Sequence, residues 1–325
     1  MSHFQVKKYT TEEYSQWNAF VSGAKNATFL FHRDFMEYHQ DRFEDCSLMV
    51  FENEKIVAIL PANRLGKMLL SHQGLSYGGL VYTQDLRLTS VVSIFAAVLK
   101  FLEQIEITTL QLKLLPTFYH QKPAQEIDYV LFLLQAKLIR RDSSSLIDLS
   151  QKVTFSKLRK RGISKAVKNQ LVIKEENQLT AFWSQVLIPN LKNRHEAQPV
   201  HSIEEITLLK AKFPLQIKQF SVYKDDIIVA GTTIFESNNV AHCQYISKYE
   251  GGENLGSLDF LFQYLITEKY KNKRYFDFGI SNEEQGRKLN KGLSNWKESF
   301  GASTAVHDFY EIEIAKYPLL ENCMI

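Results

Sequence analysis

The pattern of apolar and polar positions predicts two series of elements that follow the same order. Residues 48–62, LMVFENEKIVAILPA, hold two apolar runs around a polar turn. Residues 220–234, FSVYKDDIIVAGTTI, repeat this arrangement at an offset of 172 positions. Two short apolar runs around a polar turn are typical of a β-hairpin, so we predict a hairpin at each place.

A glycine loop, a helix and a strand follow each predicted hairpin. Tyr77-Gly78-Gly79 in the first series corresponds to Tyr249, Gly251 and Gly252 in the second. Apolar residues then recur at helical spacing, as Val91, Ile94, Phe95, Val98, Leu99 and Leu102 and as Leu258, Leu261, Phe262, Leu265 and Ile266. Short strands are predicted over residues 109–113 and 274–278.

The shared order indicates an internal duplication. We predict an α/β (α+β) protein of two tandem modules, residues 1–150 and 151–325, each with a mixed, mostly antiparallel sheet flanked by helices. Chance recurrence of hairpins and helices is the alternative explanation. Capping boxes predict a further helix in each module, after Thr10 with Glu13 and after Ser202 with Glu205.

Composition and charge narrow the function classes. The 325 residues hold 39 Lys and Arg against 36 Asp and Glu, a net charge of +3, so the whole protein is not expected to bind polyanions such as DNA. The three cysteines lack metal-ligand spacing, which predicts free thiols, a reducing compartment and no metal site. Without a signal sequence or an apolar run long enough for a membrane span, we expect a cytoplasmic protein.

Two short motifs match protein-kinase signatures in their residue types only. His32-Arg33-Asp34 and Asp277-Phe278-Gly279 match them by letter, but His39 stands where the kinase asparagine is required, and no glycine-rich loop with V-A-I-K is present. The P-loop, dinucleotide, serine-hydrolase and zinc-protease patterns are also missing from the sequence. These enzyme classes therefore lose support.

Local charge is strongest in residues 152–174, KVTFSKLRKRGISKAVKNQLVIK, which contain eight lysines and arginines and no acid. Its apolar residues fall near one helical stripe: Phe155, Leu158, Gly162, Ile163, Ala166, Val167 and Leu171. The opposite, charged face is either a solvated surface or a binding site for phosphate. The absence of acidic residues favours the phosphate site, because a solvated face usually mixes charges of both signs. The candidate phosphate-binding residues include Lys157 and Lys168 and, as substrate-binding residues, Arg159, Lys160, Arg161 and Lys165.

A second candidate segment is the loop LKNRHEAQPVHSIEEI around Pro199. Its Arg194, His195 and His201 are either surface residues or contacts for an acceptor substrate, with a histidine as a base near neutral pH.

The order and spacing of these segments resemble the Fem-like branch of the GNAT acyltransferase superfamily, over residues 4–312. The segments that carry the resemblance are the tandem modules, LRKRGISKAVKNQL, IIVAGTTIF, FDFGIS and GLSNWKESFGA. This bacterial branch includes double-GNAT aminoacyl-tRNA-dependent transferases of peptidoglycan bridges and BioF/CelD-type proteins of polysaccharide loci. The resemblance implies an enzyme, an acyltransferase.

The resemblance also implies site residues. The family's functional lysine falls on Lys297, next to Trp296, where it would stabilise the negative charge that develops at the reacting ester. A lysine snorkelling from a partly buried strand is the alternative. Asp277 in FDFG is a family position that would be structural or orient a substrate.

For the donor, the resemblance implies acyl-CoA or aminoacyl-tRNA. GNAT enzymes hold the pyrophosphate of coenzyme A at a glycine loop before a helix, here Gly251, Gly252, Asn254, Gly256 and Ser257. The window from Glu253 to Leu258 departs from the [R/Q]-x-x-G-x-[G/A] pattern, which puts coenzyme A in doubt. The first module's loop, which includes Tyr77, departs further and is expected to shape an acceptor cleft.

We therefore expect transfer of an acyl or aminoacyl group to an amine of a cell-envelope precursor, such as a peptidoglycan or polysaccharide precursor. The donor would bind the second module and the acceptor a cleft between the modules. Two alternatives stay open: a catalytically silent double-GNAT protein that binds a phosphate-bearing ligand or a partner, and a tRNA-binding protein.

Overall fold

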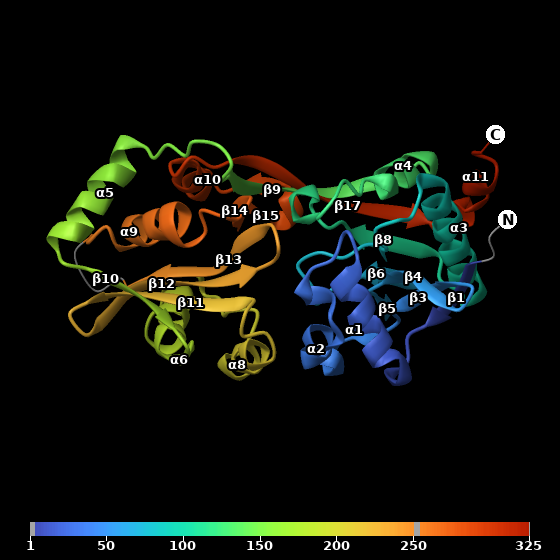
Figure 1. Ribbon diagram of the computed structural model, residues 1–325, viewed down its shortest axis with the longest axis horizontal. Helices are drawn as coiled ribbons and strands as arrows, with labels where there is room; N and C mark the ends of the chain where they lie inside the picture. Colours follow the sequence, from blue (N-terminus) through green and yellow to red (C-terminus); the bar gives the residue numbers. More distant parts are fainter. Residues whose placement is uncertain (1–3, 250–253, 325) are drawn as a thin grey trace. The chain divides into compact units, whose positions relative to one another are not determined.

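Figure 1 shows a computed structural model that describes residues 4–249 and 254–324. The chain forms two compact units: unit 1 comprises Met1–Asp142 and Val306–Ile325, and unit 2 comprises Ser143–Ala305. The sequence predicts a single boundary after residue 150, with the end of the chain in the second module. The last segment joins unit 1 because β17 (Ser303–Glu313) pairs there with β8 (Thr109–Lys113) through Phe309–Glu313.

Unit 1 contains two sheets. The first is antiparallel, with the order β1 (Phe4–Lys8), β3 (Leu48–Glu52), β4 (Lys55–Leu60) and β7 (Val81–Tyr82). In the second, β17 and β8 are followed by β6 (Met68–Ser71), β5 (Asn63–Leu65) and β2 (Glu44–Asp45). The helices of unit 1 are α1 (Tyr14–Gly23), α2 (Arg33–Met36), α3 (Leu88–Gln104), α4 (Glu126–Leu133) and α11 (Pro318–Glu321).

Unit 2 is built on one sheet flanked by helices. Its strand order is β10 (Val172–Glu176), β11 (Ile217–Lys224), β12 (Ile227–Glu236), β13 (Val240–Lys248), β14 (Tyr275–Ile280) and β9 (Lys137–Asp148). These neighbours are antiparallel except for β13 and β14, which are parallel. A small hairpin, β15 (Asn282–Glu283) and β16 (Lys288–Leu289), follows β14.

Helices cover both faces of this sheet (Figure 1). α5 (Lys157–Lys168) and α9 (Ser257–Tyr264) lie on one face, and α6 (Thr180–Phe182) and α8 (Ile203–Lys212) lie on the other. Between α6 and α8 the chain forms a π-helical turn, Trp183–Leu187, and α7 (Ile188–His195). A second π turn, Leu265–Lys269, extends α9, and α10 (Lys291–Glu298) precedes β17.

The predicted repeat is confirmed in its elements. β3 and β4 form one hairpin and β11 and β12 the other. Each hairpin contains a register shift, between Val50 and Phe51 and between Val222 and Tyr223, and these positions are again 172 residues apart. The predicted apolar faces of α3 and α9 are mostly buried, because both helices cover a sheet.

The predicted apolar stripe of α5 is wrong in part. Leu158 and Val167 are 55% and 59% exposed, and the helix fully buries Ala166. α5 packs on α9 through small residues, since a Cβ on Gly256 would lie 2.1 Å from the carbonyl oxygen of Gly162. The buried stripe of α5 is therefore narrow.

The surroundings of Gly256 and of Gly292 predict opposite effects when each is replaced by alanine. Gly256→Ala should lower the free energy of unfolding by about 2–3 kcal/mol, because Gly256 has a left-handed φ of +72° and its Cβ would strike backbone. Gly292→Ala, in α10 where the added Cβ would meet only Oδ1 of Asn290 at an ordinary contact distance of 3.7 Å, should raise it by about 0.5 kcal/mol. Urea denaturation measures both, and equal effects would contradict the packing described.

Candidate functional site

The parallel strands β13 and β14 separate at a pair of polar residues. Their pairing covers Val240 with Tyr275, Ala241 with Phe276 and His242 with Asp277, whereas β13 continues to Lys248 and β14 to Ile280. A bulge between β12 and β13, at Thr233/Ile234, lies just beyond this point, and bulges increase local strand twist. The last paired residues therefore stand where the two strands part.

Asp277 is buried there, with each carboxylate oxygen hydrogen-bonded. Oδ1 accepts from the Ser144 hydroxyl at 2.6 Å and from the Gly279 N–H at 2.8 Å, and Oδ2 lies 2.8 Å from Nδ1 of His242. Burial acts to raise the pKa of Asp277, but His242 and these hydrogen bonds outweigh it and hold the pKa below its ordinary value. Asp277 is therefore an anion at neutral pH.

Lys297 brings a buried cation to the end of the same strand. It is 3% exposed, and its Nζ donates to the carbonyl oxygens of Gly279 at 2.9 Å and Ile280 at 2.6 Å. Burial lowers the pKa of Lys297 to about 8, against the opposing effects of Asp277 and Cys243. An ammonium has three N–H donors, so one remains for another acceptor.

Gly279 is the residue on which these groups converge. Its N–H donates a hydrogen bond to Asp277, and its carbonyl oxygen accepts one from Lys297. A Cβ at this position would lie 3.2 Å from Cε1 of His242. Its φ of +73° is left-handed, which favours glycine. The glycine of FDFG thus lets β14 turn while a lysine and an imidazole approach it.

An aromatic cluster supports the helix that carries Lys297. The Trp296 ring lies 5.1 Å from Phe300, 5.6 Å from Phe262 and 5.7 Å from Phe278, measured between centroids. Trp296 was predicted to bind substrate, but its ring packs on this cluster and serves to position α10. Lys297 lies on that helix, so the alternative of a lysine on a strand is wrong.

The start of α9, where a GNAT enzyme would hold pyrophosphate, is covered by α5. Gly256 meets the Gly162 carbonyl, and Asp259 in the first turn forms an ion pair with Arg159. A carbonyl oxygen and a carboxylate both repel phosphate. Asn254 accepts from the Gly256 N–H at 3.3 Å, and Ser257 is buried. Gly251 and Gly252 lie outside the described residues, and the described part of this loop does not fit coenzyme A.

Arg159 belongs to the interior of unit 2. Besides its ion pair with Asp259, its guanidinium lies 5.4 Å from the ring centroid of Phe300. The expectation that Arg159 lies on the exposed face of α5 is therefore wrong, because its side chain is 13% exposed.

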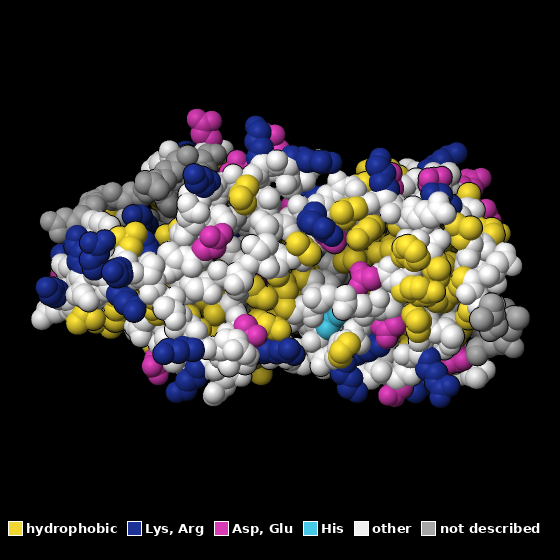
Figure 2. Space-filling view, turned by 90° about the horizontal axis from the view of Figure 1, so that it is seen from above, with side chains coloured by type: hydrophobic (Ala, Val, Ile, Leu, Met, Phe, Trp, Pro, Cys, Tyr) yellow, Lys and Arg dark blue, Asp and Glu magenta, His cyan; other side chains and the backbone are white. Residues whose placement is uncertain are grey.

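The other five cations of α5 are exposed, and Lys157 is one of them. Lys160, Arg161, Lys165 and Lys168, with Ser164, line a shallow hollow of about 380 Å³. Within the described part of the chain, no ion pair neutralises these four cations. Lys and Arg side chains gather at the left of Figure 2, where Figure 1 places α5. We call this surface the α5 face.

Other predicted substrate-binding residues have structural partners. His201 is buried, with Nδ1 2.6 Å from the Tyr245 hydroxyl. Tyr77 is buried in unit 1, where its hydroxyl donates to Thr28 at 3.0 Å. Both were expected to face a substrate, and local patterns did not predict these distant partners. Arg194 and His195 form the end of α7.

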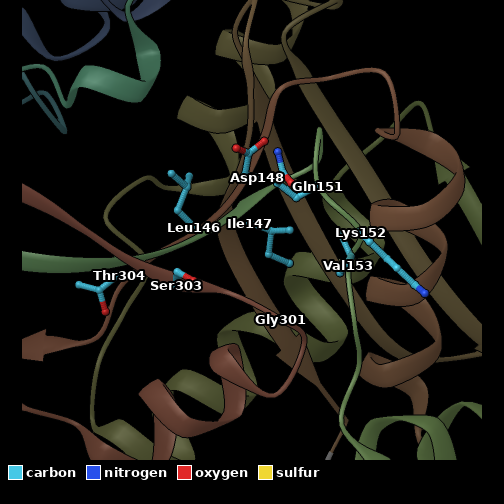
Figure 3. Close-up of a pocket in the computed structure, with 9 residues that line it drawn as sticks. All are labelled: Leu146, Ile147, Asp148, Gln151, Lys152, Val153, Gly301, Ser303 and Thr304. Carbon is cyan, nitrogen blue, oxygen red and sulfur yellow. The ribbon is translucent and has the colours of Figure 1, made fainter.

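A separate hollow of about 240 Å³ lies at the end of β9 and the start of β17 (Figure 3). Asp148, on its wall, accepts from the N–H and hydroxyl of Ser150, at 3.0 and 2.6 Å. The Lys152 side chain extends away from Leu146 and Thr304 in Figure 3. This hollow does not gather reactive groups as the end of β14 does.

The sequence pattern does not single out two residues of the site, Ser144 and His242. The usable signal was a histidine in the otherwise apolar start of β13, VAHC, after a predicted hairpin. Its partner Asp277 is 35 positions away, and Ser144 is 133 positions from Asp277. Neither pairing follows from local periodicity.

No family model matches the chain, and no curated protein matches it in sequence. Solved structures do match. The crystal structure of FemX has a TM-score of 0.66 at 11% identity, covering 98% of this chain and 99% of that chain. L-PGS from Bacillus licheniformis has a TM-score of 0.60 at 10% identity, covering 94% and 92%.

A tandem GNAT protein from the clavulanic acid biosynthesis pathway has a TM-score of 0.53 at 12% identity, covering 96% of this chain and 99% of that chain. The chain has the tandem GNAT fold. The predicted α/β architecture of two modules is thereby confirmed. The fold alone does not give the function, because one fold serves several activities.

Neither a membrane-spanning helix nor a metal-binding group is found among the described residues. No helix among them has the length and apolar character to cross a bilayer. In the same residues, no group of three or more His, Cys, Asp or Glu side chains is arranged to hold a metal ion.

The low pKa of Lys297 predicts a pH effect on stability. The unfolded lysine binds its proton up to about pH 10.5 and the folded one up to about pH 8, so wild-type stability should rise with pH between these values. Relative to Lys297→Met, the rise should be on the order of 2 kcal/mol. Urea unfolding at pH 7.5 and 9.5 measures it, and parallel changes in both proteins would contradict the shift.

Proposed function

We propose that the protein is an acyl- or aminoacyltransferase whose reaction takes place where β13 and β14 part. The observation that carries the proposal is Lys297, a buried ammonium with two N–H groups held by β14 carbonyls and a third available. A positioned cation in a low-dielectric site stabilises an oxyanion by several kcal/mol. Acyl transfer passes through a tetrahedral oxyanion, so this group suits the reaction.

The proposed reaction is aminolysis of an activated ester. The acceptor amine attacks the acyl carbonyl, a C–N bond forms, and the carbonyl oxygen becomes an oxyanion next to Lys297. Collapse of the intermediate breaks the bond to the leaving group, which departs as an alcohol or thiol once it takes up the amine's proton. Holding the two substrates together supplies much of the rate, because this aminolysis is intrinsically easy.

We infer an aminoacyl ester as donor in preference to acyl-CoA. The start of α9 presents the Gly162 carbonyl and the Asp259 carboxylate where a pyrophosphate would bind. The α5 face, with four exposed cations, suits the phosphates of a tRNA donor. For the acceptor, the resemblance of the sequence to Fem-like proteins favours an amine of a cell-envelope precursor.

Substitution of Lys297 tests the proposal. Lys297→Met should reduce transfer of radiolabelled amino acids from total aminoacyl-tRNA to a nucleotide-linked muropeptide by about 10²–10³-fold. Lys291→Met, an exposed lysine of the same helix, is the matched control and should retain full activity. Acetyl-CoA serves as the competing donor.

The charged form of Lys297 is the active one, so wild-type activity should fall as the pH rises through about 8. Undiminished transfer by Lys297→Met would overturn the mechanism and favour another site. Transfer from acetyl-CoA alone would overturn the choice of donor.

The α5 face predicts salt-dependent binding of tRNA. Replacing Lys160, Arg161 and Lys165 with Gln should weaken binding and reduce the slope of log K against log salt by about 2, at about 0.7 per lost contact. The control replaces Lys271, Lys288 and Lys291, which are exposed elsewhere in unit 2. Filter binding between 50 and 300 mM salt measures the slopes. A flat wild-type response, or equal losses in both triple variants, would exclude this face as the tRNA site.

A further inference from the structure

The imidazole of His242 is held by a carboxylate that is itself fixed. Asp277 Oδ2 lies 2.8 Å from Nδ1 of His242, while Oδ1 is held by Ser144 from β9 and by Gly279 of its own strand. An ionised carboxylate only accepts hydrogen bonds, so Nδ1 of a neutral His242 must carry the proton. The unprotonated nitrogen is then Nε2.

Nε2 is the ring nitrogen that Asp277 does not contact. The His242 side chain is 21% exposed, whereas Asp277 behind it is 3% exposed. None of the described residues hydrogen-bonds to Nε2. A neutral imidazole with a free, partly exposed Nε2 is the form that accepts a proton near neutral pH.

The charged and titratable groups around His242 come from three elements. Asp277 on β14 contacts it. Lys297 on α10 donates to the carbonyl of Gly279, and a Cβ on that glycine would lie 3.2 Å from Cε1 of the imidazole. Cys243, the next residue of β13, is buried, and burial raises the pKa of its thiol well above the ordinary value, so it stays neutral. The lysine and the imidazole thus both lie next to Gly279.

We propose that His242 accepts the proton of the attacking amine, with Asp277 as its positioning residue. This inference rests on the proposed acyl transfer. As the amine nitrogen bonds to the carbonyl carbon, its proton passes to Nε2 of His242. When the bond to the leaving oxygen or sulfur breaks, the same proton passes from Nε2 to that atom, and His242 returns to its neutral form. Lys297 stabilises the oxyanion between these two steps.

A structural role for His242, as a partner for Asp277 alone, makes a different prediction. His242→Asn places an amide nitrogen near the position of Nδ1, so the hydrogen bond to Asp277 can be kept while the base is lost. If the role is structural, this variant should act like wild type. If His242 is the proton acceptor, kcat should fall by about 10²–10³-fold with little change in KM. The acidic limb of the pH–rate profile should also disappear.

The transfer assay with total aminoacyl-tRNA or acetyl-CoA compares wild type, His242→Asn, His242→Ala and Lys297→Met. Added imidazole should restore part of the activity of His242→Ala and none of that of Lys297→Met. Wild-type kcat and an unchanged acidic limb in His242→Asn would overturn the inference and leave the proposed function intact. A wild-type protein that transfers from neither donor, with loaded donors verified, would overturn the proposed function itself.

A measurement that needs no substrate tests the same geometry. Long-range ¹H–¹⁵N correlation spectra of histidine-labelled protein at pH 7.5 should show His242 as the neutral tautomer with its proton on Nδ1. Asp277→Asn should change that tautomer, while Asp148→Asn, a matched change on β9 that is distant in sequence, should not. A wild-type His242 that is fully charged, or protonated on Nε2, at this pH would overturn the inference, because neither form accepts a proton there.

Discussion

A single buried carboxylate, that of Asp277, organises the end of β14. It accepts hydrogen bonds from Ser144 on β9, from His242 on β13 and from the backbone of Gly279. An ionised group without such partners would be strongly destabilising in the interior, and removing one member of a buried pair typically destabilises by about 3–5 kcal/mol. Asp277 therefore joins the two neighbours of β14 at the level where the parallel pairing stops.

The turn that Asp277 holds also determines where Lys297 can lie. Gly279 and Ile280 present their carbonyl oxygens to Nζ, and the aromatic contacts of Trp296 position the helix that brings the lysine there. Burial disfavours the ammonium, and Asp277 partly offsets this. The pKa of Lys297 therefore depends on Asp277, and removal of this carboxylate charge should lower the pKa of Lys297 further.

Two glycines of unit 2, Gly256 and Gly279, have different roles. Gly256 brings α9 against Gly162 of α5, and this close packing occupies the place where a pyrophosphate would meet the start of a helix. Gly279, in contrast, keeps space for an imidazole at the end of β14. The same small residue thus excludes one ligand class at the first place and gives access to reactive groups at the second. This contrast supports the proposal of a donor other than coenzyme A.

The sequence by itself determined the elements that depend on local periodicity: the two hairpins, the buried faces of α3 and α9, the short strands and the capped helix α8. It also singled out Lys297 and Asp277, through a resemblance in FDFGIS and GLSNWKESFGA. Only the tertiary structure decided which residues meet, namely Ser144 and His242 with Asp277, Arg159 with Asp259, His201 with Tyr245 and the C-terminal strand with β8. Strand pairing and helix packing join positions far apart in the chain, and a periodic pattern specifies the face of an element but not its neighbour.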